Sequence, residues 1–152
     1  MIARTRMRES GVGLIEVMIA VLILAVGLLG IAALQAITLK NVGSSSERTQ
    51  SMIQAYSALD TLRLQKAAAT AGTLNTTGGG YQCSTATALG TPGTVAGWLA
   101  DLRMTIGPSA CGKVNCAVDS GGHTNCEVGV RWNDERGSGG STQQEVKVSS
   151  RL

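Results

Sequence analysis

The chain has 152 residues, which is enough for one modest domain together with a membrane anchor. Its net charge is only +3, and Arg4, Arg6 and Arg8 carry most of that excess. The remainder therefore lacks the basic surface by which proteins bind nucleic acids. Two Trp, two Tyr and no Phe are too few for a platform that stacks bases. These numbers argue against a nucleic-acid partner.

An apolar segment follows the basic start and runs from Val17 to Leu34 without a charged residue. Its 18 residues would form a helix of about 27 Å, because an α-helix rises about 1.5 Å per residue. That length is close to the minimum that crosses a bilayer. The arginines before the segment predict that its N-terminal side stays in the cytoplasm and that the rest of the chain crosses to the outside.

Glu16 stands directly before the apolar segment and separates three interpretations of it. A secretory signal peptide would have a passable small-residue cleavage site at residues 30–32. An ordinary single-span anchor also fits the length of the segment. Neither explains Glu16, because a carboxylate costs about 3 kcal/mol at the centre of a bilayer and by default indicates a function.

The third interpretation accounts for Glu16. The stretch G-V-G-L-I-E-V, residues 11–17, resembles the class III signal of type IV pilins and pseudopilins. The resemblance implies that a basic leader, Met1–Gly11, is cut after its glycine, and that the mature chain begins at Val12 with a methylated amine. Glu16 then occupies the fifth mature position, where the family has glutamate. Val12 stands where most members have Phe, and the apolar run is similar to that of the PilV type of minor pilin.

The resemblance implies an assembly role for Glu16 and a set of partners. In this family the fifth-position glutamate pairs with the N-terminal amine of a neighbouring subunit, and the two buried charges cost far less as a pair than alone. The implied protein is a PilV-like minor pilin that is anchored in the bacterial inner membrane, has its head in the periplasm and is processed by prepilin peptidase. It would help to prime assembly of the pilus. Its partners would be other minor pilins, the major pilin and, at the pilus tip, an adhesin.

Two other functions stay open at this point. A minor pseudopilin of a type II secretion system would carry the same N-terminus. A membrane-anchored periplasmic module without a filament role would use the apolar segment only as an anchor and would not need Glu16.

Helical character is predicted to continue beyond the membrane segment. Apolar residues recur at helical spacing from Met52 onward, and charged residues occupy the other side. No proline precedes Pro92, so we expect one helix from Val12 to Ala71. Residues 12–39 would be its transmembrane or filament-core part, and residues 40–71 an amphipathic part that continues into the head. The predicted apolar face comprises Met52, Ala55, Tyr56, Leu59 and Leu62.

Glycines are the weak points of this predicted helix. Gly27, Gly30 and the Gly-Ser-Ser-Ser stretch at 43–46 lie within it, and each glycine costs about 1 kcal/mol relative to alanine. Two interpretations of Gly27 and Gly30 stay open. Small residues allow close packing between membrane helices, and they are also where the helix would melt in a filament.

Residues 72–152 are predicted to form a globular head. A Gly/Thr/Ser-rich loop over 72–94 precedes a short helix over 95–104, whose apolar residues have helical spacing. Three strands follow, and the first two flank a Gly-Gly hairpin turn. The expected fold class is therefore α+β: a long N-terminal helix packed on a small antiparallel meander, as in a type IV pilin. The expected strands cover residues 114–118, 125–132 and 144–149.

Four cysteines, all in the head, predict two disulfides in an oxidising compartment. A hairpin turn centred on Gly-Gly would place Cys116 almost opposite Cys126, within disulfide reach. Cys83 would then pair with Cys111. The other two of the three possible pairings stay open, because spacing alone does not choose. The C-x4-C spacing and a single histidine argue against a zinc site.

The sequence predicts no catalytic constellation, cofactor or small-molecule substrate. His123 lies in the glycine turn, which would not hold a catalytic triad rigidly. The glycines at 78–80 lack the lysine of a phosphate-binding loop. Asp134 and Glu135 are expected to lie in a solvated turn, because a calcium site needs more oxygen ligands.

Overall fold

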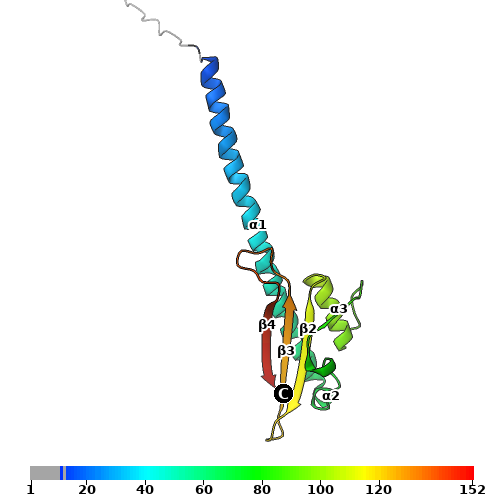
Figure 1. The fold of residues 1–152 in the computed structure, drawn as a ribbon. Coiled ribbons are helices and arrows are strands. Elements are labelled where there is room, and N and C mark those ends of the chain that lie inside the picture. Colours follow the sequence, from blue (N-terminus) through cyan, green and yellow to red (C-terminus); the bar gives the residue numbers. More distant parts are fainter. Residues whose placement is uncertain (1–10, 12) are drawn as a thin grey trace, which may run out of the picture. The chain divides into compact units, whose positions relative to one another are not determined.

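The computed structural model describes residue 11 and residues 13–152. The chain divides into two compact units, Met1–Leu39 and Lys40–Leu152. Helix α1, Leu14–Leu64, begins in the first unit and ends in the second (Figure 1).

The described part of the first unit is the N-terminal stretch of α1. Its large apolar side chains are exposed, from Leu14 at 80% to Leu39 at 72% of their surface. By length and composition, α1 is the one helix in the described part of the chain that is able to cross a membrane. An apolar surface of this extent is stable only in lipid or against other apolar helices.

In the second unit, one face of α1 packs into the core of the head. This face is rotated relative to the predicted one, because Met52 and Tyr56 are 42% and 53% exposed. Small residues take their place, and they allow the helix to approach its neighbours closely. The buried residues of α1 are Ser51, Ala55, Ala58, Leu59 and Leu62.

The expected single helix up to residue 71 is broken near its end. Gln65 leaves the helical conformation, with φ −108° and ψ 41°, and its side-chain amide donates a hydrogen bond to the carbonyl of Gly93 at 2.8 Å. The short helix α2, Lys66–Thr70, follows. Gly72 then ends the helical region with φ +72°, and main-chain bonds from Gly72 to Ala69 and from Thr73 to Ala68 close a Schellman motif.

The sheet is antiparallel and has four strands in the order β1-β2-β3-β4. Three of them are the predicted strands, slightly extended. The fourth, β1, has two residues and lies in the segment 72–94 that was expected to be a loop, after the short 3-10 helix η1, Thr77–Gly79. Strands β1, β2, β3 and β4 are Gln82–Cys83, Cys111–Val118, Thr124–Trp132 and Gln144–Arg151.

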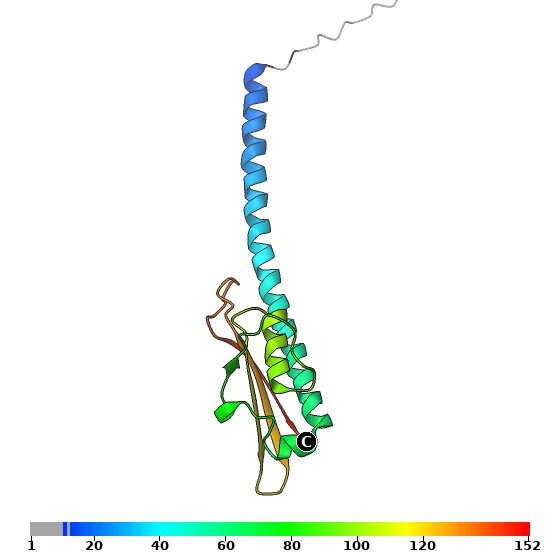
Figure 2. The ribbon, with the colours of Figure 1, turned by 90° about the vertical axis from the view of Figure 1, so that its right-hand side faces the viewer.

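The predicted short helix is α3, Val95–Thr105, and the Thr94 hydroxyl caps it by accepting a hydrogen bond from the Gly97 N–H at 3.0 Å. Helices α1 and α3 cover one face of the sheet (Figure 2). The core between the two layers is apolar, and polar side chains occupy the opposite face of the sheet. The head is therefore α+β. Its fully buried apolar side chains include Leu59, Leu102, Val114, Val128, Val130 and Trp132.

Candidate functional site

The first candidate site is the start of α1, where Glu16 lies in the first helical turn. The carbonyl of Gly13 accepts hydrogen bonds from the N–H groups of Glu16 and Val17 at 3.0 and 3.3 Å. A carboxylate in the first turn interacts favourably with the positive end of the helix dipole. Glu16 is exposed, and so is Gly11. Val12 and most of the predicted leader lie outside the described residues.

An apolar stripe adjoins Glu16 on the helix surface. A shallow groove there is lined by Glu16, Val17, Ala20, Val21 and Leu24. These residues recur at intervals of three to four or are neighbours, so they share one face of α1. Further along, α1 is continuous through Gly27 and Gly30, and a methyl group at either position would meet nothing within 4 Å. The glycines therefore leave two flat, open positions on this helix.

Both predicted disulfides are present, and each joins residues that lie directly opposite on adjacent strands. Cys83 and Cys111 link β1 to β2 with a Cα–Cα distance of 4.2 Å, and Cys116 and Cys126 link β2 to β3 with a distance of 4.0 Å. The first disulfide holds the two-residue strand β1 on the sheet. Each disulfide is worth about 2–4 kcal/mol in a domain of this size.

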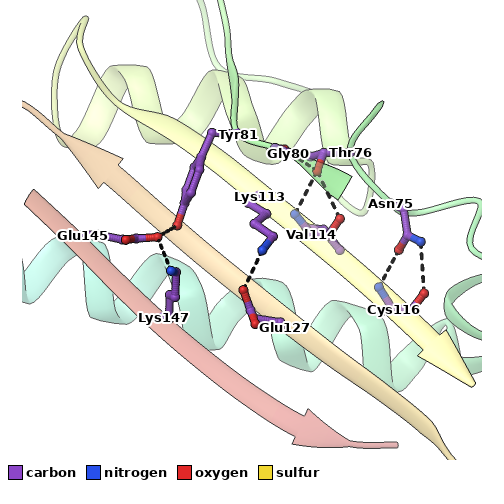
Figure 3. Close-up of polar contacts among 10 residues, drawn as sticks. All are labelled: Asn75, Thr76, Gly80, Tyr81, Lys113, Val114, Cys116, Glu127, Glu145 and Lys147. Atoms are coloured by element: carbon purple, nitrogen blue, oxygen red, sulfur yellow. Dashed lines mark hydrogen bonds and ion pairs between the residues drawn. The ribbon is translucent and has the colours of Figure 1, made fainter. Parts of the chain in front are cut away.

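The segment before β1 closes the remaining edge of β2 (Figure 3). The Asn75 side chain accepts from the Cys116 N–H at 2.7 Å and donates to the Cys116 carbonyl at 3.0 Å. Thr76 binds the main chain of Val114 in the same way: its N–H donates to the carbonyl, and its hydroxyl accepts from the N–H. The Asn75 side chain and the N–H and hydroxyl of Thr76 thus stand in for a paired strand.

A polar cluster covers the outer face of the sheet (Figure 3). The Tyr81 hydroxyl donates to Glu145, and Lys147 pairs with the same carboxylate at 2.9 Å. The guanidinium of Arg131 lies 4.5 Å from the centre of the Tyr81 ring. Burial, followed by the bond to Glu145, raises the pKa of Tyr81. That hydrogen bond from Tyr81 is the main reason that the pKa of Glu145 is lowered, and the bond to Glu145 raises the pKa of Lys147.

Gly129 explains how Tyr81 reaches this position. A methyl group at residue 129 would overlap the tyrosine and lie 2.9 Å from its Cζ. The ring therefore lies on bare backbone of β3, and only glycine leaves that space.

The loop between β3 and β4 contains a buried carboxylate, although the sequence predicts a solvated turn there. That prediction is wrong for Asp134, whose side chain is 1% exposed. The Ser44 hydroxyl donates to its Oδ2 at 2.6 Å, and Arg48 lies 3.5 Å from the same oxygen. Both partners are on α1. The one sequence signal that α1 and this loop approach closely is that residues 43–46 and residues 137–141 are both rich in glycine and serine.

Two more contacts hold this loop on α1. The Asn41 side chain accepts from the N–H of Ser138 at 3.1 Å, and Arg136 pairs with Glu47. Ser44, which lies in the stretch 43–46 predicted to be a weak point of α1, therefore anchors the loop from 133 to 141 together with its helix neighbours Asn41, Glu47 and Arg48.

The hairpin turn between β2 and β3 holds Asp119 and His123. Asp119 accepts hydrogen bonds from the N–H groups of His123 and Gly121, both at 2.9 Å, and from the Asn125 side chain at 3.0 Å. These bonds, that from the His123 N–H first, lower the pKa of Asp119. The His123 side chain is 52% exposed. Asp119 therefore acts as the organiser of the turn.

Residues 6–32 match the family model described as the prokaryotic N-terminal methylation motif. This motif supports a type IV pilin-like protein. It covers residues 6–11 of the predicted leader, Glu16 and most of the apolar run, and it implies processing by prepilin peptidase and anchoring in a membrane. The architecture agrees with this family: an apolar N-terminal helix, a four-stranded antiparallel sheet and two disulfides make a type IV pilin-like fold. Searches of curated proteins and of solved structures found no match.

Proposed function

We propose that this protein is a minor type IV pilin of the PilV type that helps to prime pilus assembly. The observation that carries the proposal is the coincidence of the methylation motif over residues 6–32 with Glu16 in the first turn of an exposed apolar helix. In this proposal the chain is inserted in the inner membrane with its head in the periplasm. It has no catalytic activity and binds no cofactor.

The mechanism follows from the electrostatics of the helix start. Cleavage after Gly11 would leave a free amine on Val12, four residues before Glu16. When apolar helices pack together away from water, a lone amine or carboxylate costs several kcal/mol. A neighbour in the correct register pairs the two charges, and a slipped neighbour leaves both unpaired. Glu16 would therefore select the register of assembly.

Mass analysis of the mature N-terminus tests the first step. The full chain is isolated from cells with and without prepilin peptidase. We expect a methylated chain that starts at Val12 in the first case and the uncut chain in the second. A mature chain that starts at any other residue would overturn the proposal.

The Glu16→Ala variant tests the assembly step. We expect it to be cut and to stay in the membrane but to enter filaments poorly, whereas Glu16→Asp should retain part of the function. Full function of Glu16→Ala would favour a membrane-anchored module without a filament role. A deletion strain separates the pilus from the secretion alternative: loss of pili supports the proposal, and loss of type II secretion with normal pili contradicts it.

A further inference from the structure

Strand β4 forms one margin of the sheet, and it pairs with β3 on one side only (Figure 1). It has eight residues, and all eight are in continuous register with β3. The main-chain groups on its other side therefore determine what this margin can bind.

The hydrogen-bond pattern shows which main-chain groups face outward. The N–H of Leu152 donates to the carbonyl of Thr124 on β3 at 2.9 Å. In an antiparallel pair, alternate residues direct both main-chain groups to the same neighbour. The even-numbered residues of β4 therefore bind β3. The residues whose main chain faces outward are Glu145, Lys147, Ser149 and Arg151, and all four are exposed.

The two edges of the sheet differ in how well they are covered. The outer side of β2 is closed by β1, by the Cys83–Cys111 disulfide and by hydrogen bonds from Asn75 and Thr76. Natural proteins protect exposed edges with proline, bulges, charged side chains on the edge, above all lysine, or charges that point inward. Strand β4 has no proline or bulge, and its inward positions 146 and 148 are valines. Lys147 is the residue on this strand that would protect its edge, and its ammonium group is already paired with Glu145.

We propose that β4 accepts an extended segment of a neighbouring subunit by antiparallel strand addition. Such a segment would continue the sheet through hydrogen bonds to the four outward residues. Its chemistry follows from the flanking side chains. Apolar residues would lie beside the half-buried Val146 and Val148, an acidic residue opposite Arg151 and a basic residue opposite Glu145.

Arg151 contributes most to the choice of partner. Its side chain is 62% exposed, and its nearest carboxylate, on Asp119, is 3.8 Å away. This ion pair is long and exposed, so an acid on an added strand would compete with Asp119 for the guanidinium. That the strand comes from another filament subunit rests on the proposed function, whereas the capacity of β4 to accept a strand does not.

A synthetic peptide tests this capacity directly. The probe has the sequence of residues 144–152, because an antiparallel alignment places its Glu opposite Arg151 and its Arg opposite Glu145. The full chain in detergent micelles is labelled with nitrogen-15, and amide hydrogen exchange is measured by NMR with and without peptide. We expect about tenfold or greater slowing at residues 145, 147, 149 and 151, and little change at the even residues that already bind β3.

Two matched peptides control for the main-chain contact. N-methylation at the peptide positions equivalent to 147 and 149 removes donors that the alignment directs at β4, and it should abolish binding. N-methylation at the positions equivalent to 146 and 148 should leave binding intact. Equal effects of the two peptides, or no protection of the odd-numbered amides, would overturn the proposal.

A charge exchange tests the choice of partner. Arg151→Glu should weaken binding of the peptide about fivefold, and a peptide with Arg in place of its Glu should restore it. Because the peptide is β4 itself, weaker protection of the same amides without peptide, rising with protein concentration, is also expected, and it supports the capacity of β4 to accept a strand. None of these readouts depends on cleavage after Gly11, so this inference and the proposed function fail separately.

Discussion

The hydrogen bond between Ser44 and Asp134 should be one of the largest single polar contributions to the stability of the head. Ser44→Ala removes a donor 2.6 Å from a carboxylate that is buried in the folded chain. Loss of a hydrogen bond to a buried charged group costs about 2 kcal/mol. Arg48 will not compensate, because it is 48% exposed and 3.5 Å from the carboxylate, and such pairs are worth at most about 1 kcal/mol. The better helix propensity of alanine returns about 0.5 kcal/mol, so we expect a net loss of about 1.5 kcal/mol.

Ser45→Ala is the matched control for this prediction. Ser45 is the next residue of α1 and is exposed, so its replacement should change only helix propensity and raise stability by about 0.5 kcal/mol. Comparison of the two variants therefore isolates the hydrogen bond, at about 2 kcal/mol. The free energy of unfolding is measured by urea titration of the full chain in detergent, followed by the fluorescence of the buried Trp132. A difference of less than about 0.5 kcal/mol between the variants would refute the reasoning.

Three further predictions follow from the sheet and its turn. Gly129→Ala should lower the free energy of unfolding by about 1–3 kcal/mol, because the Tyr81 ring must move; in a Tyr81→Ala background it should be nearly neutral, and an equal cost in both backgrounds would contradict the contact. Folding lowers the pKa of Asp119, so the ionised carboxylate stabilises the folded state. This stabilisation is fully present above the unfolded pKa of about 3.9 and is lost as the pH falls through the lower pKa of the folded state. Asp119→Asn should therefore flatten the loss of stability in acid, and an unchanged pH profile between about 5 and 2 would argue against this role. Replacement of Cys83 and Cys111 by serine should cost about 3 kcal/mol, because this disulfide spans 28 residues; thermal unfolding that matches the native chain would exclude it.

Local sequence patterns were sufficient to predict those features of the fold that depend on residues close together in the chain. The hairpin is an example: two glycines at its turn set the register, and the register alone placed Cys116 opposite Cys126. The apolar run and the glycine at residue 72 likewise predicted where helical structure begins and ends. The helix begins at Leu14 and not at the expected Val12, so Glu16 lies in its first turn and not one and a half turns from its start.

Contacts between distant segments were not predictable in this way. The face of α1 was misplaced because Met52 and Tyr56 fit a helical period as well as the smaller residues that the sheet selects. Strand β1 has only two residues, too few for any periodicity, and it exists because Cys83 is held by Cys111. Its stability comes from its neighbour and not from its own sequence.

The sequence by itself determined that this protein carries a methylation-type N-terminal motif, an apolar helix that follows Glu16 and a disulfide-linked antiparallel head. Only the tertiary structure decided that Asp134 is buried against Ser44, 90 residues away, and that Tyr81 lies across Gly129. The physical reason is the range of the interactions. Periodicity, turns and spacing record what a residue does with its near neighbours, whereas burial of a carboxylate or closure of a sheet edge depends on groups that only the fold brings together.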